Sequence, residues 1–133
     1  MKHRKFKPFG SVSALTLGGG GIGNVWGKTT REEAIATVIA AIDSGINHLD
    51  MAPMYGKGEA EIVVGEASKD TDLSEIKITT KCQLGTIPDD QVYDKLNESL
   101  TESFERMKID KVNLFLLHSQ LIKDDYELPI LND

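Results

Sequence analysis

The sequence is poor in cysteine and has no long apolar run. Cys82 is the only cysteine, so no disulfide can form within the chain, and we expect a reducing compartment. No stretch approaches the roughly 20 apolar residues of a membrane-spanning helix. The basic amino end, residues 1–5, is followed by Pro8 and Gly10 instead of the apolar block of a secretory signal. These absences predict a soluble, cytoplasmic protein that does not bind a membrane.

A surplus of positive charge is also lacking. The chain has 15 Lys and Arg residues against 21 Asp and Glu residues, which gives a formal net charge of −6. Nucleic acids and anionic membranes bind clustered Lys and Arg residues, so neither is an expected partner. No metal site is predicted from the sequence. The 133 residues match one ordinary domain, but they are about half of what a closed (β/α)₈ barrel needs.

Three apolar runs end on side chains that can take part in catalysis. The runs, each with the residue that ends it, are 46–49 with Asp50, 75–80 with Lys81, and 112–117 with His118. Parallel α/β folds place their active sites at the carboxyl ends of such strands. Because side chains alternate along a strand, Asp50, Lys81 and His118 are expected to point into one barrel mouth. Tyr55 follows Asp50 on the next loop, and Cys82 is placed beyond the second strand without a role.

The segments between these runs are predicted to be helices. Thr30 and Glu33 form a capping box, and apolar residues at helical spacing follow until Gly45 ends the helix. A second helix is expected over 59–68, and a third opens at Pro88. The third helix carries an apolar stripe of Val92, Leu96, Leu100, Phe104 and Met107.

The strands recur at a regular interval. They are predicted to start near Leu15, Ile46, Ile76 and Val112. A spacing of thirty-odd residues is the size of one β-α-β step and of one-eighth of a barrel. The predicted fold class is therefore α/β, a parallel (β/α)₈ TIM barrel of which residues 15–118 hold the first four strands and three helices. Residues 1–14 are expected to form an N-terminal hairpin, and residues 119–133 a polar loop or tail.

A glycine-rich stretch after the first strand supports a competing interpretation. Gly18, Gly20 and Gly23 satisfy G-x-G-x-x-G, so a Rossmann-type dinucleotide-binding domain is an alternative. In that fold a helix opens within the glycine run and meets the pyrophosphate with its N-terminus. Here the first capped helix begins only at Thr30, which makes the alternative less favoured. A turn without any ligand is a further interpretation of the glycines.

Taken singly, the polar residues of the expected mouth have structural explanations. Asp50 could cap a loop, Lys81 could be a solvated strand end, and His118 could be a core residue. Their common direction is what favours a site. His48, one layer below, is expected to be a core histidine. Trp26 is a candidate wall of a substrate pocket, with plain loop packing as the equal alternative.

Several motifs of the chain resemble those of the aldo-keto reductases in order and spacing. The matching pieces are 15–18, 45–56, 58–61 with 64–65, 78–81 and 116–118. The D-x-A-x-x-Y-G motif from Asp50 to Gly56, with the later T-K and L-H pieces, is specific in combination. The resemblance covers the chain from its first residues to about His118. Residues 119–121 depart from the proline and acid often found after this histidine in the family.

The resemblance implies a barrel of the aldo-keto reductase type and assigns roles to residues. The positions that match the catalytic tetrad of the family are Asp50, Tyr55, Lys81 and His118. Gly19 and Gly20 match positions that border the nicotinamide, and Asp50 is included among the cofactor contacts. The implied cofactor is NADPH, with NADH as the alternative, and the implied substrate is a small carbonyl compound.

The chemistry of these residue types fits carbonyl reduction. The carbonyl oxygen needs a proton, and tyrosine is a poor acid near neutrality unless a nearby charge stabilises its phenolate. Lys81 would supply that charge, Asp50 would hold Lys81 in place, and His118 would orient the carbonyl by a hydrogen bond. The hydride must come from a cofactor, because no side chain can donate one.

The function predicted from the sequence is NAD(P)H-dependent reduction of an aldehyde or ketone to an alcohol. A non-catalytic cofactor-binding or regulatory member of the same fold is the alternative. In the family, the pyrophosphate and adenosine contacts come largely from later strands of the barrel, which these residues do not include. The chain is therefore expected to be a fragment of the enzyme, a truncated product or a half-barrel that self-associates, and to be inactive alone.

Overall fold

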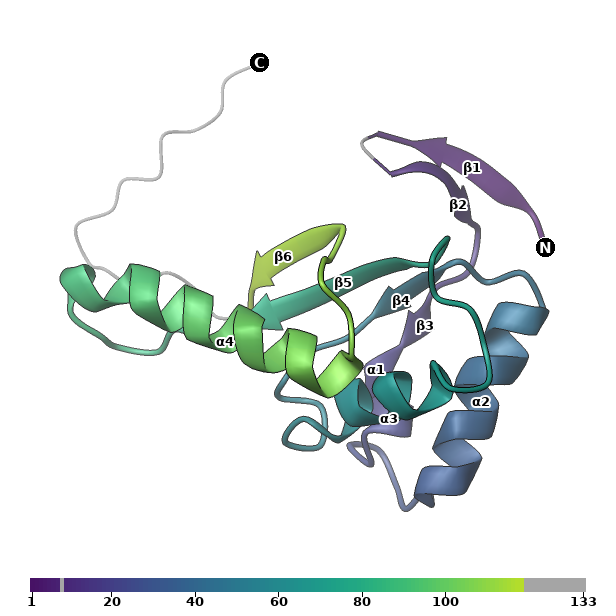
Figure 1. The fold of residues 1–133 in the computed structure, drawn as a ribbon, viewed down its shortest axis with the longest axis horizontal. Helices are drawn as coiled ribbons and strands as arrows, with labels where there is room; N and C mark the ends of the chain where they lie inside the picture. The colour runs from purple at the N-terminus through teal and green to yellow at the C-terminus, as the bar shows by residue number, and fades with distance from the viewer. Residues whose placement is uncertain (8, 119–133) are drawn as a thin grey trace.

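The computed structural model describes residues 1–7 and 9–118 (Figure 1). The chain begins with an antiparallel hairpin, as predicted for the amino end. Its two strands are β1 (His3–Phe6) and β2 (Gly10–Ser13). Pro8, a predicted turn residue, and the predicted tail at 119–133 lie outside the described residues.

Four parallel strands form the central sheet in the order in which they occur in the chain. They are β3 (Leu17–Gly18), β4 (His48–Asp50), β5 (Lys77–Cys82) and β6 (Leu114–Leu117). Each new strand adds at the same edge of the sheet. A Rossmann sheet would instead place its fourth strand beside its first. The consecutive order is that of a (β/α)₈ barrel and agrees with the predicted fold class.

The parallel strands begin one or two residues later than predicted, with β4 at His48, β5 at Lys77 and β6 at Leu114. The first strand starts at Leu17, which pairs with Leu49, whereas Leu15 makes no ladder contact and is 60% exposed. β5 extends through Cys82, which pairs with Leu117 and is buried. Placing Cys82 beyond the strand was therefore wrong, because pairing with β6 continues the strand to that residue.

β6 is an open edge of the sheet. Its apolar run predicts a strand that is covered on both faces. The structure contradicts this, since three of its leucines keep 36% to 41% of their surface exposed: Leu114, Leu116 and Leu117. Within the described residues no further strand pairs with β6, which therefore stands at the edge of the sheet.

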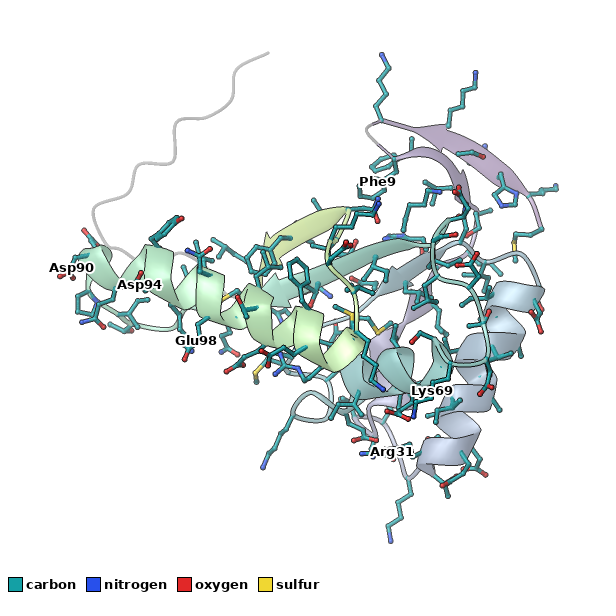
Figure 2. All side chains as sticks on the ribbon, in the orientation of Figure 1. Phe9, Arg31, Lys69, Asp90, Asp94 and Glu98 are labelled. Atoms are coloured by element: carbon teal, nitrogen blue, oxygen red, sulfur yellow. The ribbon has the colours of Figure 1, made fainter. Side chains whose placement is uncertain are left out.

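Three helices of at least two turns follow β3, β4 and β5, and they lie on one side of the sheet (Figure 1). They are α2 (Arg31–Asp43), α3 (Glu59–Ala67) and α4 (Val92–Met107), the last preceded by a 3-10 turn, η1 (Asp89–Gln91). The predicted capping box is present, because the Thr30 hydroxyl accepts from the Glu33 N–H and the Glu33 carboxylate accepts from the Thr30 N–H. Figure 2 shows three acidic residues following one another along η1 and α4: Asp90, Asp94 and Glu98. No helix of the described residues is long and apolar enough to cross a bilayer.

The glycine-rich stretch after β3 is not a loop throughout. Gly19–Ile22 form one helical turn, α1, which the Gly23 N–H closes by donating to the Gly19 carbonyl at 2.9 Å. The sequence predicts a loop over residues 18–27, and this prediction is wrong for α1. Glycine has a low helix propensity, which tertiary packing overrides here. The first long helix still begins at Arg31, as predicted.

The hydrophobic core lies between the sheet and the helices. Leu49 of β4 packs in one cluster with Val38 of α2, Val63 of α3 and Met107 of α4. None of these four side chains is exposed. Removing them from water is the main term that holds the helices against the sheet.

A buried carboxylate joins α3, α4 and β5. Glu61 is fully buried, and its oxygens accept from the Thr80 hydroxyl at 2.6 Å and from Arg106 Nε at 2.7 Å. The helices approach closely there, since a Cβ at Gly65 would lie 2.2 Å from the Arg106 carbonyl oxygen. A buried charge is tolerated only with partners, so these contacts determine how α3 and α4 sit on β5.

Glu66 makes a second link between α3 and α4, at the surface. It accepts hydrogen bonds from Lys108 Nζ at 2.8 Å and from Lys69. These bonds, that of Lys108 first, lower the pKa of Glu66 from 4.5 to about 2. Because the pKa is lower in the folded state, the stability that Glu66 contributes is present above about pH 4.5 and is lost as the pH falls toward 2.

Arg106→Met should lower the free energy of unfolding by about 3 kcal/mol, because it leaves the Glu61 carboxylate buried without its cation. Lys95→Met is the matched control, since the Lys95–Glu98 pair on α4 is exposed and contributes little. Urea unfolding followed by circular dichroism measures both variants. Equal small losses would contradict a structural role of the buried pair.

Glu66→Gln should reduce the free energy of unfolding near neutral pH and change it little in strong acid, where the native carboxyl is also protonated. Urea unfolding of both proteins between about pH 7 and about pH 2 measures the difference. Glu105→Gln controls for the loss of one negative charge, because Glu105 is exposed on α4. A difference that grows on acidification would be the wrong sign for this account.

Candidate active site

The predicted mouth lies at the carboxyl edge of the sheet. Asp50 is the last residue of β4, Lys81 is the last but one of β5, and His118 is the first after β6. The pairing of β5 and β6 continues to this point, because the His118 N–H donates to the Cys82 carbonyl at 2.8 Å. Parallel strands in this register bring the three ends to one edge, as the sequence predicts.

The Lys81 ammonium group binds three oxygen atoms. It donates to Asp50 Oδ1 at 2.8 Å, to the Met51 carbonyl at 2.9 Å and to the Tyr55 hydroxyl at 3.2 Å. The Lys81 side chain is only 10% exposed, whereas the Asp50 side chain is 38% exposed. An ammonium group has three protons to donate, and its attraction to each oxygen is stronger away from water. Lys81 is thus held in one place against the Tyr55 hydroxyl.

Tyr55 sits on a hydrogen-bonded loop between β4 and α3. Its N–H donates to the Ala52 carbonyl at 3.0 Å, and its carbonyl accepts from the Ala60 N–H at 3.2 Å. The loop then turns through three residues with positive φ, which are Gly56 (69°), Lys57 (55°) and Gly58 (90°). The two glycines adopt this conformation without a Cβ clash, so the chain can reverse into α3. Both the N–H and the carbonyl of Tyr55 are therefore held by hydrogen bonds, and its side chain is half-buried.

His118 flanks the Tyr55 ring together with Lys81. The rings of Tyr55 and His118 meet edge to face, with centroids 5.6 Å apart and planes at 87°. Lys81 Nζ lies 4.8 Å from the centroid of the same Tyr55 ring. His118 is exposed at the edge of the sheet, where a small molecule can reach it. The structure therefore brings Asp50, Tyr55, Lys81 and His118 together.

His48 lies one layer below, as predicted. Its Nε2 is 2.9 Å from the Thr79 hydroxyl, and its Nδ1 is 3.0 Å from the Thr16 hydroxyl. Burial lowers the pKa of His48, an effect that Asp50 opposes and Lys81 reinforces. A neutral ring satisfies both nitrogens here, because each hydroxyl can donate or accept. His48 is therefore a half-buried, hydrogen-bonded residue outside the group around Lys81, and not a fully buried core residue.

The glycines predicted to border a nicotinamide lie in α1. Gly19 and Gly20 are buried, and Trp26 on the following loop is 80% exposed. The Trp26 ring packs beside Gly20, where a Cβ would lie 2.8 Å from a ring carbon. Loop packing of Trp26 is thus present, while its place in a pocket wall and the cofactor contacts of the glycines stay predictions.

The Met51 carbonyl is a partner of Lys81 that the sequence does not predict. A main-chain acceptor gives no side-chain signal, because every residue carries one. The one available hint is position, since Met51 directly follows Asp50 where β4 ends and its carbonyl is free of the strand ladder.

The sequence is similar to known oxidoreductases over most of its length. The model of the Aldo/keto reductase family matches residues 14–129. The chain is 32% identical over 109 residues to L-galactose dehydrogenase of Arabidopsis thaliana, a match that covers 80% of this chain and 34% of that protein. It is 30% identical over 125 residues to the NADH-specific methylglyoxal reductase of Escherichia coli, covering 84% of this chain and 38% of that protein. The chain thus spans little more than a third of the length of these two relatives.

The fold is likewise similar to that of solved aldo-keto reductases. One from Klebsiella pneumoniae, in complex with NADPH, matches with a TM-score of 0.72 and 27% identity, over 90% of this chain and 39% of that one. The parallel sheet and its helices are accordingly the N-terminal part of a (β/α)₈ TIM barrel. The family match, the relatives and the fold agree, and the chain belongs to the aldo/keto reductase family.

Proposed function

We propose that this chain carries the proton-transfer residues of an NAD(P)H-dependent oxidoreductase that reduces an aldehyde or ketone to an alcohol. The observation that supports this most is the position of the Lys81 ammonium, 2.8 Å from the Asp50 carboxylate and 3.2 Å from the Tyr55 hydroxyl. A cation at that distance stabilises the phenolate that remains after tyrosine has given up its proton. The proposed substrate is a small carbonyl compound.

Tyr55 is the proposed proton donor. As a hydride adds to the carbonyl carbon, negative charge develops on the carbonyl oxygen, and the Tyr55 O–H transfers its proton to that oxygen. The Lys81 charge stabilises the Tyr55 phenolate, and Asp50 holds Lys81 so that the charge does not move away. The low exposure of Lys81 strengthens this attraction, because less water screens it.

His118 is proposed to orient the carbonyl group. It lies exposed at the edge of the sheet, and its ring meets the Tyr55 ring edge to face. A carbonyl oxygen that approaches the Tyr55 hydroxyl would therefore also approach the imidazole. A hydrogen bond from His118 would hold that oxygen at the place where the proton arrives. Fixing the reacting group in this way is a large part of the rate that an enzyme supplies.

The residues present fit the reacting end of a nicotinamide cofactor. Gly19 lies beside the Tyr55 ring, and the partly exposed Asp50 binds the same ammonium group as the Tyr55 hydroxyl. Together with Gly20, these residues would border the nicotinamide. When bound, a reduced nicotinamide supplies the hydride. NADPH is the proposed cofactor, because the Klebsiella pneumoniae reductase is in complex with NADPH. NADH is the alternative, because the Escherichia coli relative is NADH-specific by name.

We propose that the complete enzyme contains more of the barrel than this chain. The matches cover 34% and 38% of the two relatives described above, and the sheet has an open edge at β6. The remaining strands would supply the phosphate and adenosine contacts. If the chain occurs by itself, the exposed leucines of β6 would be covered by a second copy. A cytoplasmic location fits the reduced, buried Cys82.

In the complete enzyme, Tyr55→Phe should lower kcat by roughly 100-fold or more, because only the proton donor is removed. Tyr93→Phe is the matched control, since Tyr93 is 73% exposed on α4. The measurements are NADPH oxidation with a panel of small aldehydes and a fluorescence titration of NADPH binding, which should change little. An unchanged kcat would refute the role of Tyr55. Tight NADPH binding without turnover in the wild type would favour the non-catalytic alternative.

The 133-residue chain alone should bind NADPH weakly and should not reduce aldehydes, although it holds all four tetrad positions. The hydride donor must be held within reacting distance, and the phosphate contacts that hold it are expected elsewhere in the barrel. NADPH fluorescence with light scattering on the same sample measures binding and self-association together. Micromolar binding by a monomer would place the main cofactor contacts within this chain.

A further inference from the structure

The one-turn helix α1 packs directly against the loop that carries Tyr55. A Cβ at Gly56 would lie 2.0 Å from the Gly23 carbonyl oxygen, and a Cβ at Gly23 would lie 2.7 Å from the Tyr55 carbonyl oxygen. Backbone therefore meets backbone at this contact, with no side chain between that could adjust. α1 and the Tyr55 loop are consequently held at a fixed separation.

Gly19 is the residue of α1 that faces the Tyr55 ring. A Cβ at Gly19 would lie 2.8 Å from Tyr55 Cδ2, 3.0 Å from Met51 Sδ and 3.2 Å from Ala60 Cβ. Met51 and Ala60 are fully buried, whereas the Tyr55 ring is only half-buried. An added methyl group would therefore be relieved by movement of the Tyr55 ring, the one neighbour with open space beside it.

We propose that Gly19 is a positioning residue for Tyr55: the absence of a side chain there leaves the space in which the ring sits with its hydroxyl against Lys81. This inference rests on the proposed function. It differs from the role that the family resemblance implies for Gly19, which is to border the nicotinamide. A side chain at Gly19 would face the Tyr55 ring, so the proposed effect of its absence reaches the proton donor through the ring even where the Gly19 backbone borders the nicotinamide.

A small displacement of the ring is enough to disturb the site. The ring must retreat by at least about 0.6 Å for a Gly19 methyl group to reach an ordinary contact of 3.4 Å. The Tyr55 hydroxyl is already 3.2 Å from Lys81 Nζ, so a shift of this size weakens that hydrogen bond. Misplacing a reacting group by about 1 Å can cost on the order of 100-fold in rate.

Gly21 provides a matched control within the same helical turn. A Cβ at Gly21 would have nothing within 4 Å. Neither Gly19 nor Gly21 has a positive φ, so alanine is compatible with the backbone at both positions. Gly19→Ala and Gly21→Ala therefore make the same chemical change in α1, and only the first reaches the Tyr55 ring.

In the complete enzyme, Gly19→Ala should lower kcat by roughly 10- to 100-fold and change the Kd of NADPH less than about twofold. Gly21→Ala should leave both unchanged. In a Tyr55→Phe background, Gly19→Ala should cause no further loss of kcat, because its effect passes through the Tyr55 hydroxyl. Steady-state kinetics and a fluorescence titration of NADPH measure these quantities.

The same experiment separates the two ways in which the interpretation can fail. A weaker NADPH affinity in Gly19→Ala, or a loss of kcat that persists in the Tyr55→Phe background, would mean that Gly19 acts on the cofactor and would overturn the inference. An unchanged kcat in Gly19→Ala would overturn it as well. A Tyr55→Phe enzyme with unchanged kcat would instead remove the proposed function on which the inference rests.

A second readout uses the 133-residue chain without turnover. Tyr93→Phe and Tyr126→Phe leave Tyr55 as the only tyrosine. With ¹³C-labelled tyrosine, Gly19→Ala should shift the Tyr55 ring resonances, and Gly21→Ala should leave them in place. Unmoved resonances would overturn the inference. An unfolded Gly19→Ala chain beside a folded Gly21→Ala chain, judged by circular dichroism, would also overturn it, because the ring would then not be the part that yields.

Discussion

The site depends on keeping one ammonium group inside the protein. A buried charge is stable only when it is paired and hydrogen-bonded, and Lys81 meets this condition with a carboxylate, a carbonyl and a hydroxyl. The acceptors are Asp50 at the end of β4, Met51 next to it, and Tyr55 on the following loop. The bonds that satisfy Lys81 therefore also fix the loop that carries Tyr55. A single charge therefore orders the residues around Tyr55, the proposed proton donor.

β5 carries a polar cluster on each of its faces. On one face, Lys81 donates to Asp50. On the other face, which the helices cover, the neighbouring Thr80 donates to the buried Glu61. Glu61 in turn accepts from Arg106 of α4. Adjacent residues of a strand face opposite sides. Thr80 therefore helps to position the helices, while Lys81, the next residue, carries the ammonium group of the site. A shift of β5 along its axis would break both clusters.

The parts of the fold that the sequence determined by itself are those with local signals. Thr30 and Glu33 mark the start of α2 within one helical turn. Asp50 marks the end of β4, and Lys81 marks the end of β5 to within one residue, because each follows its own apolar run. Alternation along the strands then places these two side chains on one face without any knowledge of the packing. The family resemblance assigned Tyr55 to the tetrad, since its position on a loop has no periodic signal.

Only the tertiary structure decided the different burial and contacts of residues of the same type that lie close together in the sequence. Glu59 and Glu61 are both carboxylates in the first turn of α3, yet Glu59 pairs with Arg31 at the surface while Glu61 is fully buried. Likewise Gly19 meets the Tyr55 ring, whereas Gly21 in the same turn meets nothing. These differences depend on segments that are distant in the chain and close in space. A sequence pattern reports the period of an element but not the neighbour that packs against each of its faces.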